Sequence, residues 1–168
     1  MLTNDTIAAL YATHGARLYR YAVLLLADCT AAEDAVQDVF VQLARTFKDR
    51  SMSDISFAYL ATTLRNTCYS MLRRRRGALI GLATLVGRVG LIEPASADAS
   101  EEERLLIDEA LRQLPAEQRE VVYLKVFEGL TFQEIADRCG ISINTAGSRY
   151  RYALEALRRA LAPTDQSC

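Results

Sequence analysis

Helical spacing of apolar residues runs through almost the whole 168-residue chain, and this pattern constrains the fold more than any other feature. No long run alternates between apolar and polar residues as a strand would. Four of the eight glycines and one of the three prolines fall within 77–99, between two helical halves. The sequence therefore predicts an all-α protein of two small helical domains, 1–76 and 100–168, joined by a linker over 77–99.

The linker has an unusual composition. Residues 78–92 are mostly apolar, although Gly81, Gly87, Arg88 and Gly90 interrupt them. So short and interrupted a stretch does not predict a membrane-spanning helix, and no membrane insertion is expected. The chain opens without a basic segment followed by a long apolar one, so no signal peptide is predicted and a cytoplasmic location is expected.

Hydroxyl residues mark the starts of several helices. In a capping box, a Ser or Thr side chain and a Glu three residues later satisfy free backbone NH groups at the start of a helix. Other helices are expected to begin near Ser56 and after Ser142. The capping-box pairs are Thr30 with Glu33, Ser100 with Glu103, and Thr131 with Glu134.

Apolar residues at helical spacing predict which helix faces point into the two cores. The helix that starts at Thr30 has an inner face of Val36, Val39, Phe40, Leu43 and Phe47. The last helix has an inner face of Ala146, Tyr150, Ala153, Leu154, Leu157 and Leu161.

The stretch IADRCGISINTAGSRYR, residues 135–151, has the pattern of a helix-turn-helix. Gly140 can adopt the positive φ of a tight turn, and Ala136 is small where two crossing helices would touch. In such a unit the start of the second helix enters the major groove, where amide, hydroxyl and guanidinium groups bond bases or phosphates. The predicted DNA-facing residues are Asn144, Thr145, Gly147, Ser148, Arg149, Arg151 and Tyr152. A plain helical hairpin with a solvated polar face is the alternative.

A second polar face lies on the helix expected after Ser56. Aromatic rings among amides and hydroxyls can stack on unpaired bases and bond to them. The helix then ends in four arginines, 73–76, which also suit the negative end of a helix dipole. The alternatives are tyrosines packed at the core edge and a solvated basic helix end. The face carries Tyr59, Thr62, Thr63, Asn66, Tyr69, Ser70 and Arg73.

The preceding helix carries an acidic stripe, made of Asp34, Gln37, Asp38 and Val41. Two acids one turn apart, beside an exposed apolar residue, suit a protein partner with a basic helix. Considered alone, the stripe is better explained as an ordinary acidic surface.

Composition limits the possible functions. The net charge is −1 and the pI is near 5.9, so a nucleic-acid function must rest on local charge. The four cysteines form no C-x-x-C pair and His14 stands alone, so no metal and no cofactor are predicted. The chain has no nucleophile–base pattern either, so it is not expected to be an enzyme.

Three segments together resemble the small alternative sigma factors of bacterial RNA polymerase, the extracytoplasmic-function (ECF) group of the sigma-70 family. AAEDAVQDVFVQLAR resembles the core-binding segment of sigma region 2. FAYLATTLRNTCYSMLRRRR resembles the helix that melts the promoter and reads its −10 element. LPAEQREVVYLKVFEGLTFQEIADRCGISINTAGSRYRYALEALRRAL resembles region 4. The resemblance implies a factor that binds core RNA polymerase and directs promoter recognition, with an anti-sigma factor as regulatory partner.

The resemblance also implies roles for individual residues. The segment that docks on the coiled coil of the polymerase β′ subunit contains Asp34, Gln37, Asp38, Phe40 and Val41. The −10 surface contains Lys48, Arg50, Ser56, Tyr59, Thr62, Arg65, Asn66, Tyr69, Arg73 and Arg74. Region 4 would also touch the β-subunit flap through an apolar surface. Its surface for the −35 duplex contains Thr131, Asn144, Thr145, Gly147, Ser148, Arg149, Arg151 and Tyr152.

Two positions depart from the family's pattern. Tyr59 stands where the family usually has Trp, and Gly147 stands where it usually has Lys or Arg. A glycine inside a helix costs about 1 kcal/mol relative to alanine, and a DNA contact is missing as well, so an unusual −35 preference is expected. An alternative function stays open, a stand-alone helix-turn-helix regulator with an N-terminal half that senses a ligand or partner. Such a regulator would bind duplex DNA without polymerase.

Overall fold

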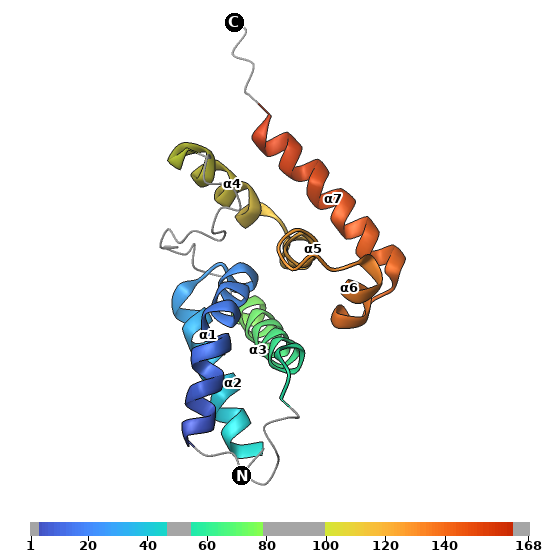
Figure 1. Ribbon diagram of the computed structural model, residues 1–168. Coiled ribbons are helices and arrows are strands. Elements are labelled where there is room, and N and C mark those ends of the chain that lie inside the picture. The colour runs from blue at the N-terminus through green and yellow to red at the C-terminus, as the bar shows by residue number, and fades with distance from the viewer. Residues whose placement is uncertain (1–3, 47–54, 79–99, 163–168) are drawn as a thin grey trace, which may run out of the picture. The chain divides into compact units, whose positions relative to one another are not determined.

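The computed structural model describes residues 4–46, 55–78 and 100–162, and every regular element among them is a helix (Figure 1). The all-α prediction is therefore confirmed. None of these helices combines the length and the apolar character needed to cross a membrane. The helices are α1 (Asn4–Leu26), α2 (Cys29–Thr46), α3 (Phe57–Ala78), α4 (Glu101–Gln113), α5 (Ala116–Val126), α6 (Phe132–Cys139) and α7 (Ile143–Leu161).

Some predictions fall on residues outside the described part of the chain. They include Phe47 of the expected inner face and Lys48 and Arg50 of the expected −10 surface. α3 ends at Ala78, and 79–99 are not described, so the linker boundaries stay a prediction.

The chain divides into two compact units, one containing α1–α3 and the other α4–α7. In the first unit each helix packs against the other two. Their shared core includes Leu18 and Leu24 of α1, Val39 of α2, and Leu60 and Leu64 of α3, all with almost no exposed surface. Burying one such side chain contributes about 1.5–3 kcal/mol. This core therefore determines which faces of α2 and α3 stay exposed.

The start of α2 differs from the prediction. A capping box of Thr30 with Glu33 was expected, but the helix already begins at Cys29. Asp28 caps it instead, because its Oδ1 accepts a hydrogen bond from the backbone NH of Ala31 at 3.0 Å. The predicted cap at Thr30 is wrong because the carboxylate two residues earlier takes that role.

In the second unit α7 packs against α4, α5 and α6. The capping boxes predicted at Ser100 and Thr131 are both present. Ser142 caps α7, as predicted, by accepting a hydrogen bond from the NH of Thr145 at 3.1 Å. Gly140, between α6 and α7, has the positive φ expected of it, 65°. Local sequence signals thus set the start of three of the four helices in this unit.

The inner face of α7 is shorter than predicted. Ala146 and Ala153 are fully buried, and Leu154 and Leu157 are half-buried. Leu161, however, is 41 % exposed. It is the last residue of the helix, two turns beyond Ala153, where the described neighbours no longer cover α7.

Candidate polymerase and nucleic-acid interfaces

The acidic stripe of α2 lies on the exposed side of that helix. Asp34, Gln37 and Asp38 are exposed, and Val41 is 47 % exposed. The core of the first unit lies beneath the opposite side, through residues such as Val39. The carboxylates therefore remain in water, and we expect their replacement to leave the packing of the helix unchanged.

Phe40 is the exception among the residues assigned to polymerase binding. Its side chain is only 7 % exposed, and its ring meets that of Tyr11 edge-on, with the centroids 5.2 Å apart. It belongs to the inner face of α2 together with Val36 and Leu43. The assignment of Phe40 as a contact residue is corrected accordingly, because its ring packs inside the unit and supports α2 from beneath.

The outer face of α3 carries the described residues predicted to bind −10 DNA. Arg65 and Tyr69 are half-buried, and the guanidinium carbon of Arg65 lies 4.5 Å from the ring centroid of Tyr69. This cation–π contact orders both side chains along the helix. The exposed members of the face are Ser56, Tyr59, Thr62, Asn66, Arg73 and Arg74.

Two hydroxyl groups on this face already bond to the helix. Ser56 Oγ accepts a hydrogen bond from the NH of Tyr59 at 3.2 Å, and so caps α3. Thr62 donates its hydroxyl proton to the carbonyl oxygen of Ala58 at 2.8 Å. The hydroxyl oxygen of Thr62 can still accept a hydrogen bond. It can therefore bind a donor such as a base amino group, whereas a phosphate offers only acceptors.

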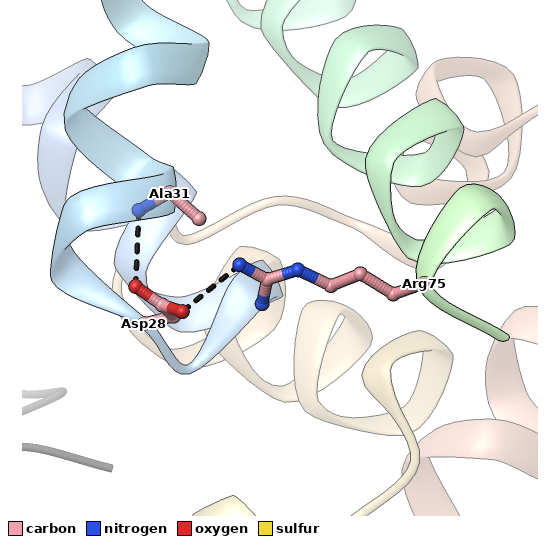
Figure 2. A network of polar contacts seen from close by, with 3 residues as sticks. All are labelled: Asp28, Ala31 and Arg75. Carbon is pink, nitrogen blue, oxygen red and sulfur yellow. Dashed lines mark hydrogen bonds and ion pairs between the residues drawn. The ribbon is translucent and has the colours of Figure 1, made fainter. Parts of the chain in front are cut away.

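The arginine run at the end of α3 is divided between two sides of the helix. Arg73 and Arg74 are exposed. Arg75 instead reaches the start of α2, where its Nη2 lies 2.9 Å from Oδ2 of Asp28 (Figure 2). The sequence predicts the run as one basic helix end, and the position of Arg75 differs from that prediction. The missed signal was spacing, because Arg75 follows the buried Cys68 by seven residues, about two turns along the same face.

Asp28 therefore serves α2 and α3 at once. One carboxylate oxygen caps α2 through Ala31, and the other pairs with Arg75 (Figure 2). The backbone hydrogen bond from Ala31, followed by the hydrogen bond and charge of Arg75, holds the pKa of Asp28 below its usual 3.8. The carboxylate is thus ionised throughout the neutral range.

A groove of about 380 Å³ lies between α2 and α3. Asp38, Gln42 and Arg45 line it from α2, and Ser70 and Arg74 line it from α3, with other residues. It adjoins both the acidic stripe and the outer face of α3. In the described ranges, no group of three or more His, Cys, Asp or Glu side chains is placed to hold a metal ion.

α6 and α7 form the predicted helix-turn-helix. Gly140 ends α6 in the left-handed conformation, and the NH of Ile141 donates to the carbonyl oxygen of Ala136 at 3.0 Å across the turn. Ile135, Ala136 and Ala146 have almost no exposed surface. The contact among these buried side chains holds the start of α7 closely against α6.

The first turns of α7 carry the residues predicted to read duplex DNA. Thr145 has a hydroxyl 2.8 Å from that of Ser142, so it takes part in the helix cap. Around Gly147, nothing lies within 4 Å of the point that a Cβ would occupy. Asn144, Arg151 and Tyr152 are exposed, and Thr145, Gly147, Ser148 and Arg149 are half-buried.

Thr131, also predicted to contact DNA, is exposed but engaged in the cap of α6. Its hydroxyl donates to Oε2 of Glu134 at 2.8 Å and accepts a hydrogen bond from the NH of Glu134 at 3.2 Å. Hydrogen bonds from the backbone and side chain of Thr131 lower the pKa of Glu134. Thr131 is therefore held in one orientation, with its proton committed to Glu134.

Two segments of the chain match known protein regions. Residues 10–78 match Sigma-70 region 2, and residues 104–157 match Sigma-70, region 4. A helical region 2 followed by a helix-turn-helix region 4 defines the class of sigma-70-type transcription initiation factors. The fold agrees with a solved member, the sigma factor RpoE in complex with the anti-sigma factor NepR from Bartonella quintana. The two chains are 28 % identical, with a TM-score of 0.70 over 96 % of this chain and 99 % of that one.

Curated relatives narrow the class. The ECF RNA polymerase sigma factor SigL of Mycobacterium tuberculosis is 35 % identical over 157 residues, which cover 91 % of this chain and 87 % of SigL. The ferric citrate uptake sigma factor FecI of Escherichia coli is 27 % identical, over 89 % of this chain and 87 % of FecI. This chain belongs to the ECF RNA polymerase sigma factors. It is an alternative sigma factor that directs transcription initiation, and nothing in these comparisons favours a stand-alone regulator.

Proposed function

We propose that this sigma factor binds core RNA polymerase through the acidic stripe of α2 and binds promoter DNA through the outer faces of α3 and α7. The proposal rests on how two surfaces are arranged on the first unit, α1–α3. An acidic stripe without a role in the core and an aromatic, amide and arginine face lie on different helices of one packed unit. Polymerase and DNA can therefore occupy the unit at the same time.

At the −10 element, α3 is suited to unpaired bases. The amide of Asn66 offers both a donor and an acceptor to a base edge, and the ring of Tyr59 offers a stacking surface. Unpairing a base costs a few kcal/mol, and stacking on an aromatic ring returns roughly 1–3 kcal/mol per base. Arg73 and Arg74 would hold the phosphates of the strand. Lys48 and Arg50, in the preceding loop, remain predicted contacts.

At the −35 element, α7 is suited to the major groove. Asn144 matches the donor and acceptor pattern of adenine, and Arg149 matches that of guanine. Ser148 and the backbone NH groups of the first turn of α7 suit phosphates. The exposed Tyr152, whose ring lies 5.2 Å from the guanidinium carbon of Arg151, adds an apolar contact with a positive charge beside it.

Other partners follow from family membership. We assign nucleotide chemistry to the polymerase and no enzymatic step to this chain, which would act in the cytoplasm where the polymerase works. An anti-sigma factor is the expected regulator, since RpoE was solved in complex with one. A second polymerase contact, with the β-subunit flap, is assigned to apolar residues such as Val126, the last residue of α5, and Phe127, which follows it. They are 56 % and 37 % exposed.

Run-off transcription tests the proposal. Core RNA polymerase of the host bacterium is combined with the purified chain and a pool of genomic promoter fragments. We expect discrete transcripts only when both proteins are present, from start sites that share −10 and −35 sequences. Tight, sequence-specific binding of the chain to duplex DNA without polymerase, and no transcripts with it, would contradict the proposal.

A further inference from the structure

Arg75 lies on a different side of α3 from the residues of the proposed −10 surface. An α-helix turns by about 100° per residue, so nine residues place Arg75 on the opposite side of α3 from Asn66. It continues instead the buried stripe of Leu64 and Cys68, both without exposed surface. A guanidinium at the end of an apolar stripe needs an anionic partner, and Asp28 supplies it at 2.9 Å.

The end of α3 has few other anchors. Every residue from Tyr69 to Arg75 is half-buried or exposed, so Cys68 is the last described residue of α3 that the core encloses. The arginines that the proposed −10 surface uses, Arg73 and Arg74, lie in this weakly anchored segment. Arg75, which pairs with Asp28, directly follows Arg73 and Arg74 in α3.

The partner of Arg75 is held in place by its own turn. Ala27, just before Asp28, has a φ of 53°, a left-handed value that is unusual for alanine, and its NH donates to the carbonyl oxygen of Val23 at 2.8 Å. On the other side, Asp28 is bound to the NH of Ala31. The carboxylate of Asp28 is therefore held in place by its own turn, and the ion pair with Arg75 joins the end of α3 to it.

We infer that Asp28 and Arg75 form a positioning pair, which holds the last turns of α3 so that Arg73 and Arg74 face the promoter strand. The inference rests on the proposed −10 surface. Arg75 itself makes no DNA contact, since it points toward α2 and its Nη2 donates to Asp28. Its contribution to promoter opening passes through the orientation of its neighbours.

The experiment uses full-length variants in holoenzyme with a promoter fragment from the run-off pool. The variants are Asp28→Asn, Arg75→Gln, Arg75→Lys, the double variant Asp28→Asn with Arg75→Gln, and Arg74→Gln as the matched arginine control. Asn caps helices as well as Asp does, so Asp28→Asn removes the charge pair and keeps the cap of α2. Open-complex formation is measured against salt concentration, and thermal melting and core binding are measured for each variant.

We expect Asp28→Asn and Arg75→Gln each to reduce open-complex formation by about twofold to fivefold, the range that the loss of a partly exposed ion pair allows. The double variant should be no worse than either single variant, and Arg75→Lys should recover most of the loss. The salt dependence should stay that of the wild type in all of these, because Arg73 and Arg74 still reach the phosphates in the open complexes that do form, and the loss lies in orienting them beforehand. Arg74→Gln alone should lower the salt slope by about one phosphate contact. Core binding should be unchanged throughout.

Three results would overturn the inference. If Arg75→Gln lowers the salt slope as Arg74→Gln does while Asp28→Asn leaves opening unchanged or improves it, Arg75 is a DNA contact. If the pair variants change only the melting temperature and Arg74→Gln is impaired, the pair is purely structural. If Arg74→Gln is also normal, the proposed −10 surface is wrong, and the inference that rests on it is wrong as well.

Discussion

Substitution of a single residue, Gly147, tests both the stability of α7 and its proposed contact with DNA. Its φ is not positive, and open space surrounds the position of a Cβ. We therefore expect Gly147→Ala to stabilise the second unit by up to about 1 kcal/mol. Gly147→Lys should add a phosphate contact and steepen the salt dependence of −35-dependent transcription by about one ion. Thermal melting and transcription at several salt concentrations measure both effects.

Two outcomes would change the role assigned to Gly147. If both substitutions impair −35-dependent transcription, the glycine admits the DNA backbone closely. If neither changes stability, salt dependence or −35 dependence, position 147 does not face DNA.

Asn66→Ala should affect promoter opening more than polymerase binding. The side chain is exposed on α3, on the side away from the buried Leu64 and Cys68, so its loss leaves the core intact. Removing a base contact of this kind should slow opening by about tenfold, which corresponds to ~1.4 kcal/mol. Permanganate reactivity of the −10 thymines reports opening, and a pull-down with core polymerase reports binding. Wild-type reactivity and kinetics at −10 would argue against the assignment.

At the scale of elements, the charge of α2 gives a direct prediction. Reversal of Asp34 and Asp38 to lysine should weaken core polymerase binding by at least about tenfold and leave folding intact, because both are exposed. Reversal of Glu109 and Glu155, exposed on α4 and α7, changes the net charge equally and serves as the control. If the variant with Asp34 and Asp38 reversed melts at a lower temperature yet binds core polymerase normally, the acidic stripe contributes to stability and not to polymerase binding.

The pair that joins α2 to α3 predicts a pH dependence of stability. A carboxyl group with a lowered pKa in the folded state stabilises the protein above its unfolded pKa, 3.8 here, and the stabilisation is lost as pH falls below that value. At pH 7 Asp28→Asn should be less stable than the wild type by under about 1 kcal/mol, since both partners are partly exposed. The difference should shrink below pH 3.8, and denaturant titrations at pH 7 and pH 3 measure it. A difference that is equal at both values would mean that the charge contributes nothing.

Elements with strong local signals were predictable from the sequence, and their contacts across the fold were not. The capping boxes at Ser100 and Thr131 were predictable because all their partners lie within four residues. The role of Asp28 depends in part on Arg75, 47 residues away, and no local pattern encodes such a pair. Helical spacing placed Phe40 correctly on the inner face of its helix, but no local pattern identified Tyr11 as the ring that it meets.

For the whole molecule, charge predicts how the protein finds DNA. With a net charge of −1, and its proposed DNA contacts limited to a few local surfaces, the isolated chain should bind promoter duplex weakly and core polymerase well. Gel shifts with and without core polymerase, at physiological salt, test this directly. Nanomolar binding of the chain alone to one duplex sequence would contradict it.

The division into two units, each with its own buried core, has a consequence for how such a chain can change over generations. Effects of substitutions at distant, independent sites on stability add, while those of neighbours interact. With α7 in its proposed role at the −35 element, a lineage can therefore change the side chains of α7, and with them the upstream sequence that it recognises, without disturbing the packing that supports Asn66 and Tyr59. The two halves of a promoter can then diversify separately.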